Sequence, residues 1–193
     1  MQKKLLKMEI CGIFFVLAIS VFMQNLYELS HKTVIGVLFG AVNDSIWENC
    51  KTLMLPYLIW AMIELLTLRP TFKRFVVSKI ITLYILGISF LTLCSIYGVF
   101  GFNSHMLAEF IAAILCTATS FYLSFCLYTE ISKSEQLFAP SLCMLMLFIA
   151  LYCSFTPFPP NTYIFVDRAT GLYGLIPSHI DTGAIVLDTL YIP

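Results

Sequence analysis

Residues 45–68 read SIWENCKTLMLPYLIWAMIELLTL, a short polar start followed by a long apolar run. Since an α-helix rises about 1.5 Å per residue, about 20 apolar residues cross the hydrocarbon core of a bilayer. The stretch therefore predicts a transmembrane helix with a polar motif at its beginning. The composition of the whole chain is also that of a membrane protein, because 60% of its 193 residues are hydrophobic and only 11% are charged.

Four further stretches have the same length and apolar character, and they cover residues 9–27, 75–101, 104–128 and 138–156. The first of them is expected to remain as a helix, since no small-residue cleavage site of a signal peptide follows it. The stretch 33–42, TVIGVLFGAV, is too short to cross a bilayer and predicts an interfacial or re-entrant segment. The sequence thus predicts an all-α membrane protein in which residues 1–156 form a bundle of five transmembrane helices.

The composition changes after residue 156. The segment 157–193 is rich in Pro, Gly, Thr and Tyr, and it holds no run long enough to cross a membrane. Its prolines at 157, 159 and 160 end the fifth helix. The segment is too apolar for a solvated disordered tail. We therefore expect an ordered extracytoplasmic C-terminal tail, packed over the bundle.

The positive charges divide unevenly between the two expected membrane faces. Eight lie on the side of the N-terminus, namely Lys3, Lys4, Lys7, Arg69, Lys73, Arg74, Lys79 and Lys133, and three lie opposite, namely Lys32, Lys51 and Arg168. The positive-inside rule then predicts a multi-pass protein of the cell membrane with a cytoplasmic N-terminus and an extracytoplasmic tail. Because the formal net charge is zero, nothing favours nucleic acid as a partner.

The segment 43–51, NDSIWENCK, contains the clearest local pattern. Ser45 and Glu48 have the spacing of a capping box, in which each side chain accepts a hydrogen bond from a backbone N–H of the first turn. Trp47 suits the headgroup level, where the indole N–H stays hydrated. Glu48 and Lys51 are three residues apart and can form an ion pair. These residues account for a helix start, but Asn43, Asp44 and Asn49 are more polar groups than a cap needs.

A second pattern, Ser104-His105-x-x-x-Glu109, begins the fourth apolar stretch, and Ser104 is placed to cap that helix. His105 and Glu109 share a helix face, and Glu109 lies deep enough for desolvation to matter. Glu109 is then either an acid hydrogen-bonded to a neighbour, or a ligand for a metal or another cation that faces Glu48 across the bundle. Glu64, near the other end of the second helix, is expected to pair with Arg69 or Lys73.

These patterns place a polar layer at the outer face of the bundle. Its candidate ligand-binding residues are Asn43, Asp44, Ser45, Trp47, Glu48, Lys51, Glu109 and Asp167. The candidate catalytic residues are Glu48, Glu109 and His105. Metal motifs such as HExxH are absent from the sequence, so His31, His105, Glu48 and Glu109 are the only plausible metal ligands. Asp167, with Thr170 and Gly171 after it, is more typical of a turn than of catalysis. His179 has no recognisable context.

Two stretches resemble an uncharacterised bacterial family of small multi-pass membrane proteins. Residues 40–51, GAVNDSIWENCK, resemble its pattern V-N-E-S-x-W-E-H-x-K, and residues 155–174, FTPFPPNTYIFVDRATGLYG, resemble its tail pattern F-x-x-x-P-P-x-x-P-x-F-x-D-x-x-T-G-x-Y-G. Asn49 stands where the family pattern has histidine, which argues against a mechanism built on a histidine there. The resemblance implies no activity. It implies a shared feature made of Asn43, Ser45, Trp47, Glu48, Lys51, Pro160, Asp167, Gly171 and Tyr173.

Three functions fit these observations. The first is a binding or transport-associated membrane protein, in which Asn43, Asp44, Glu48 and Glu109 hold a small polar ligand or a cation under the tail as a lid. The second is a membrane-embedded hydrolase or transferase, with Glu48 or Glu109 as general base, His105 as its partner and a metal as an optional component. The third is a structural accessory subunit that packs against a membrane-protein partner or a second copy. The sequence does not identify a cofactor.

Overall fold

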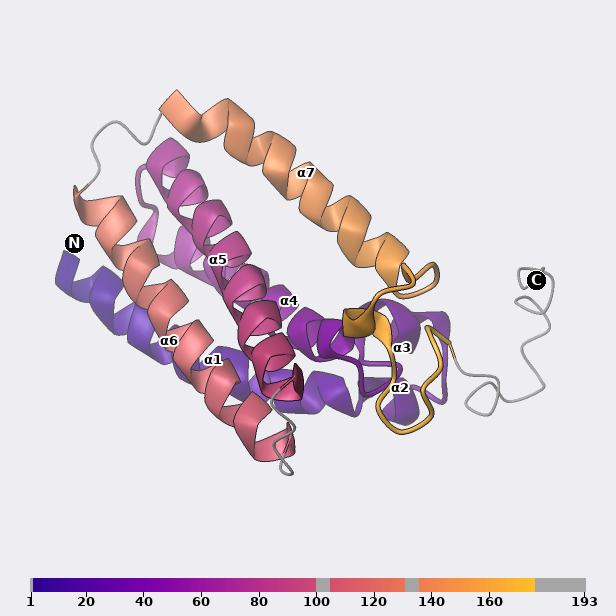
Figure 1. Cartoon of the computed structure of the whole chain (residues 1–193). Coiled ribbons are helices and arrows are strands. Elements are labelled where there is room, and N and C mark those ends of the chain that lie inside the picture. Colours follow the sequence, from indigo (N-terminus) through magenta and orange to yellow (C-terminus); the bar gives the residue numbers. More distant parts are fainter. Residues whose placement is uncertain (1, 100–104, 131–135, 176–193) are drawn as a thin grey trace.

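The computed structural model describes residues 2–99, 105–130 and 136–175 (Figure 1). Five long helices dominate this part: α1 Gln2–Gln24, α4 Ile46–Leu68, α5 Phe72–Val99, α6 His105–Glu130 and α7 Phe138–Phe155. Each is long and apolar enough to cross a membrane. No strand occurs in the described ranges, apart from one isolated bridge between Val166 and Tyr173. The all-helical fold and the five candidate membrane spans are therefore confirmed.

Four of these helices enclose most of the core, and the fifth, α7, adds Phe148 and Tyr152 to it from outside the ring. α1 packs against α4 and α6, and α5 packs against the other sides of the same two helices. α7 packs mainly along α5, on the outside of the four-helix bundle (Figure 1). The core between the four helices contains fully buried side chains from each of them, among them Val16, Tyr57, Leu86 and Phe121. Polar side chains that point into this ring of helices therefore lie either at its ends or along its axis.

Close packing between α1 and α4 depends on Gly12. A Cβ added at Gly12 would lie 2.5 Å from Nε1 of Trp60 and 2.7 Å from a ring carbon of Phe121. Overpacking of this kind costs about 1–3 kcal/mol. We expect Gly12→Ala to lower the free energy of unfolding by that amount, measured by titration with a denaturing detergent. Ala18→Val, at an exposed position of the same helix, is the control. Equal stability of the two variants would contradict this packing.

Two short helices and the tail gather at one end of the bundle. α2 Leu26–Leu29 and α3 Val34–Phe39 lie beside the 3₁₀ helix η2 Tyr163–Phe165 (Figure 1). The first long helix ends at Gln24 and not at residue 27, and its start at Gln2 lies seven residues before the expected one. The short stretch expected at 33–42 forms α3 followed by an extended Gly40. The tail segment 157–175 lies at this same end, and residues 176–193 lie outside the described part.

Glu64 has a different partner from the expected Arg69 or Lys73. Its Oε2 lies 2.5 Å from Nζ of Lys79, which is only 2% exposed. Lys79 was assigned above to the inner-face cations, yet it lies inside α5 and points into the bundle. The spacing of charges along the chain cannot reveal this, because Glu64 and Lys79 meet across two helices. The remaining expectations about which membrane face each loop occupies are predictions.

Candidate functional site

Half of the expected capping box is present at the start of α4. The Ser45 hydroxyl accepts a hydrogen bond from the backbone N–H of Glu48 at 3.3 Å. The reciprocal bond is absent from the described contacts, so that part of the prediction is wrong. The N–H of Ser45 donates instead to Oδ1 of Asn43 at 3.0 Å, and Oε2 of Glu48 accepts from the N–H of Val42 at 3.2 Å. The carboxylate of Glu48 is turned toward the chain that precedes the helix.

Glu48 and Lys51 form a buried ion pair, as their spacing predicted. Nζ of Lys51 lies 2.7 Å from Oε2 of Glu48, and both side chains are almost fully buried. The hydroxyl of Thr156, at the end of α7, donates to Oε1 of Glu48 at 2.7 Å and accepts from Lys51 at 2.8 Å. Lys51 also donates to the carbonyl of Val37 in α3 at 3.2 Å. Both charges are thus compensated inside a closed network that ties α3, α4 and α7 together.

Trp47 belongs to an aromatic cluster and not to a hydrated layer. Its ring centroid lies 5.1 Å from that of Phe155 and 5.4 Å from that of Phe165. Trp47 is 8% exposed, and its Nε1 has no hydrogen-bond partner among the described residues. The expectation of a hydrated indole N–H is therefore not met. The reason is that η2 of the tail folds down onto the first turn of α4 and covers the ring.

Asp167 organises the tail as a turn, as its context predicted. Its Oδ2 accepts hydrogen bonds from the N–H of Thr170 at 2.9 Å and from the Thr170 hydroxyl at 2.6 Å. Its Oδ1 accepts from the N–H of Asp44 at 2.9 Å, which anchors the turn to the start of α4. Gly171, at a φ of 72°, completes the turn. Burial of Asp167 opposes ionisation, but these hydrogen bonds outweigh it and hold the pKa of the carboxyl below its usual range.

We expect Asp167→Asn to loosen the tail, because an amide offers Thr170 a donor where an acceptor is needed. An unsatisfied buried polar group costs about 1–3 kcal/mol. Limited proteolysis within 157–175 should accelerate accordingly, whereas Asn161→Asp, at an exposed position of the same segment, should have no effect. Since the folded pKa of Asp167 is depressed, wild-type docking is complete above the ordinary carboxyl pKa of 3.8 and is lost as the pH falls below it. Equal cleavage of all three proteins would contradict the anchor.

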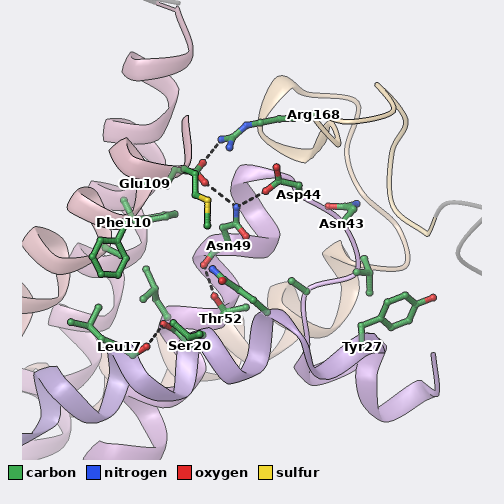
Figure 2. A pocket seen from close by; sticks show the side chains of 18 of the residues that line it. Leu17, Ser20, Tyr27, Asn43, Asp44, Asn49, Thr52, Glu109, Phe110 and Arg168 are labelled. Atoms are coloured by element: carbon green, nitrogen blue, oxygen red, sulfur yellow. Dashed lines mark hydrogen bonds and ion pairs between the residues drawn. The ribbon is translucent and has the colours of Figure 1, made fainter. Parts of the chain in front are cut away.

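A cavity with a volume of about 720 Å³ lies between α1, α4 and α6, next to this anchor (Figure 2). Its charged lining residues are Glu28, Asp44, Glu109 and Arg168. Uncharged polar side chains also line it, from Ser20, Gln24, Tyr27, Asn43, Asn49 and Thr52. Its apolar wall includes Leu17, Leu53, Phe90 and Phe110. The described lining therefore combines three carboxyl groups, one guanidinium and a large apolar surface.

A chain of polar contacts joins residues of the cavity lining. The side-chain amide of Asn49 donates to Oδ1 of Asp44 at 3.1 Å and to Oε2 of Glu109 at 3.2 Å (Figure 2). Arg168 of the tail forms an ion pair with Oε1 of Glu109. Burial of Arg168 opposes its charge, but the bond to Glu109 outweighs burial and raises the pKa of the guanidinium above its usual value. Asn49, the departure from the family pattern, thus joins two carboxyl groups.

The structure separates the sequence-predicted site residues into two groups. Asn43, Asp44 and Glu109 line the cavity, whereas Ser45, Trp47, Glu48, Lys51 and Asp167 form the scaffold beside it. Glu109 therefore does not face Glu48 within the cavity. Arg168 also lines the cavity, as a tail residue that could descend on the polar layer, but nothing in the sequence pairs it with a carboxyl 59 residues away. Its only signal is its position next to Asp167.

The histidine candidates have no support as ligands. His31 is exposed, in the loop between α2 and α3, and it does not line the cavity. The side chain of His105 lies outside the described residues, as do Ser104 and His179. Within the described ranges, no group of three His, Cys, Asp or Glu side chains could hold a metal ion. The metal site and the pairing of His105 with Glu109 are therefore only sequence-based hypotheses.

Residues 1–175 match a family described as "Family of unknown function (DUF6512)". The chain belongs to this family. The match ends one residue after Gly174, where the resemblance seen in the sequence also ends. Neither the curated proteins nor the solved structures include one that matches the chain. The match therefore agrees with the resemblance to an uncharacterised family, and it assigns no function to the cavity.

Proposed function

We propose that this chain is a binding or transport-associated membrane protein whose cavity holds a small organic cation with an apolar body. One observation carries the proposal: the guanidinium of Arg168, in the tail, forms an ion pair with the carboxylate of Glu109 in the cavity. The tail thereby presents to the cavity the kind of group that a cationic ligand would present. A ligand that reaches Glu109 has to take the place of Arg168.

The charges of the lining support a cation over an anion. Among the described lining residues, Glu28, Asp44 and Glu109 face a single positive side chain, that of Arg168. Near a membrane interior, carboxylates need a paired positive charge or a donor. Asn49 supplies donors to Asp44 and Glu109. An ammonium group placed between these two carboxylates would pair with both and would relieve the excess of negative charge.

The apolar wall supports an organic ligand over a bare metal ion. Leu17, Leu53, Phe90 and Phe110 border the same cavity. Typical small-molecule sites combine an apolar lining with a few convergent polar groups, in volumes of about 300–1,000 Å³. The volume here, about 720 Å³, falls within that range. The apolar side chains would cover the body of the ligand, and the carboxylates would orient its charged end.

The tail supports a lid over the cavity. The side-chain amide of Asn43 donates to the carbonyl of Gly174 at 2.9 Å, and the N–H of Asp44 donates to Asp167. These two bonds fix both ends of the turn that carries Arg168. Release of Arg168 from Glu109 would free one contact of the turn and leave the other two in place. By the positive-inside rule, we place this lid on the extracytoplasmic side.

The alternative functions have less support. A hydrolase or transferase needs an available carboxylate as general base. The carboxylate of Glu48 already contacts Lys51, Thr156 and Val42 outside the cavity. That of Glu109 is already paired with Arg168 and Asn49. A purely structural role explains the scaffold but does not explain why charged side chains line a cavity. The binding function accounts for both, because the scaffold holds the residues of the cavity in place.

A ligand that binds only the folded state raises its stability by about 2.7 kcal/mol at a hundredfold excess over Kd. We therefore expect primary and quaternary ammonium compounds with apolar groups to raise the unfolding temperature of the detergent-solubilised protein. Neutral isosteres and carboxylate analogues of the same size are the matched controls. Stabilisation by ammonium compounds alone supports the proposal. Equal stabilisation by the neutral isosteres, or none by any compound, contradicts it.

A further inference from the structure

A second buried polar cluster lies on the bundle axis, away from the cavity. Nζ of Lys79 in α5 lies 2.7 Å from Oε2 of Glu9 in α1 and 2.5 Å from Oε2 of Glu64 in α4. The hydroxyl of Ser124 in α6 donates to Oε1 of Glu9 at 3.0 Å. Glu9, Glu64 and Lys79 are at most 3% exposed. All four helices of the ring therefore contribute to this cluster.

The charges of the cluster do not balance when all three groups are ionised. Two carboxylates would then share one ammonium in a setting where each unpaired charge is costly. The remaining titratable group against Lys79 is Tyr57, whose hydroxyl pairs with Thr82 at 2.6 Å. The rings of Tyr57, Phe75 and Phe121 surround the ammonium at 5.0–5.5 Å. Lys79 supplies the cation in both described ion pairs, that with Glu9 and that with Glu64.

The two carboxyl groups differ in their donors. Glu9 accepts a hydrogen bond from Lys79 on one carboxylate oxygen and from Ser124 on the other. Oε1 of Glu64 is buried and accepts no well-aligned hydrogen bond among the described residues, although the Trp60 side chain lies near this carboxyl group. The indole N–H of Trp60, one turn earlier, donates to the carbonyl of Met8 at 3.2 Å. A proton on Oε1 of Glu64 would turn this bare acceptor into a donor and neutralise the excess charge.

Buried hydroxyls lead from the cavity toward this cluster. Ala113 lines the cavity, and Thr117, Ser120 and Ser124 follow it on the same face of α6 at helical spacing. Thr117 and Ser120 are fully buried, and within the described residues their hydroxyls have no partner. Unsatisfied buried hydroxyls are rare and call for a partner such as water. Their place between the cavity and Ser124 offers a path for water or a proton.

We infer that Glu9, Glu64 and Lys79 form a proton-binding site on the bundle axis, with the proton held by Glu64. One H⁺ from water binds the Glu64 carboxylate to give the neutral acid, and the site then has the charges of a single Glu9–Lys79 ion pair. This site is independent of the ligand proposed for the cavity. It gives a membrane protein of this fold a group that can take up and release a proton within the bundle.

Infrared spectroscopy of the full chain in lipid nanodiscs at neutral pH tests this inference, because a protonated carboxyl has its own carbonyl stretch that shifts in D₂O. We expect wild type to show this band. Glu64→Gln and Glu9→Gln should each remove it, since each leaves one carboxylate for one ammonium. Lys79→Met should keep or strengthen the band, and Glu130→Gln, at an exposed position of α6, should leave it unchanged.

Several results would overturn the inference. One is a folded wild type without the band, a measurement that needs no variant to fold. Another is a band that survives in both Glu64→Gln and Glu9→Gln. A band that appears in wild type only after removal of sodium, with sodium found by elemental analysis, would replace the proton by a metal cation. Loss of ammonium binding in the cavity would not affect any of these results, so the two proposals fail separately.

Discussion

Lys51→Met is expected to destabilise the folded chain by about 3–5 kcal/mol, because it leaves the carboxylate of Glu48 buried without its counter-ion. The side chains of Lys51 and Glu48 are 0% and 3% exposed. Lys51 also donates hydrogen bonds to the Thr156 hydroxyl and to the carbonyl of Val37, so its loss affects α3, α4 and α7 together. Unfolding by a denaturing detergent, followed by circular dichroism, measures the difference. Lys73→Met, at an exposed position, is the matched control and should cost little.

The double variant Glu48→Gln/Lys51→Met separates lost charge from lost packing. If the single variant fails because of an unpaired buried charge, removal of both charges should recover most of the lost stability. Recovery would show that the pair is a scaffold and not a ligand site. A Lys51→Met protein as stable as Lys73→Met would contradict the closed network around Glu48.

Arg168→Gln and Glu109→Gln are expected to change cation binding in opposite directions. In the proposed site Arg168 would compete with the ligand for Glu109, so its removal should tighten the binding of an ammonium compound. Loss of Glu109 removes the carboxylate itself and should weaken binding. Hydrogen bonds to charged groups contribute about 1.5–3 kcal/mol, which corresponds to a change in Kd of at least about tenfold. Equilibrium titration with the compound that most stabilises wild type measures both changes.

Lys73→Gln controls for a change of net charge, because Lys73 lies at an exposed position at the start of α5. Its Kd should equal that of wild type. If Arg168→Gln weakened binding instead, Arg168 would contact the ligand and the lid account would be wrong. If Arg168→Gln and Glu109→Gln both kept the wild-type Kd, the cation would bind at another place on the protein.

Features that depend on local spacing were predictable from the sequence. The five candidate spans follow from apolar length, and the Ser45 cap and the Glu48–Lys51 pair follow from offsets of three residues. The Asp167 turn follows from the residues next to it. Each of these needs only the geometry of one helix or one turn.

Features that depend on how helices face one another were not predictable. A helix that is apolar all round has no strong periodicity to fix which side faces the core. The sequence therefore placed Glu48 in the polar site, although its side chain turns toward Val42 and Thr156. The contacts of Arg168 with Glu109 and of Lys79 with Glu64 join distant segments, and residue spacing contains no information about them.

Native mass spectrometry of gently purified protein, with an ammonium compound added at a concentration that stabilises wild type, tests the cation-binding account most directly. Wild type should be compared with Glu109→Gln and with Glu130→Gln, which removes an exposed carboxyl from the same helix. We expect one bound cation on wild type and on Glu130→Gln, and none on Glu109→Gln. The same adduct on all three proteins, or none on wild type, would contradict it.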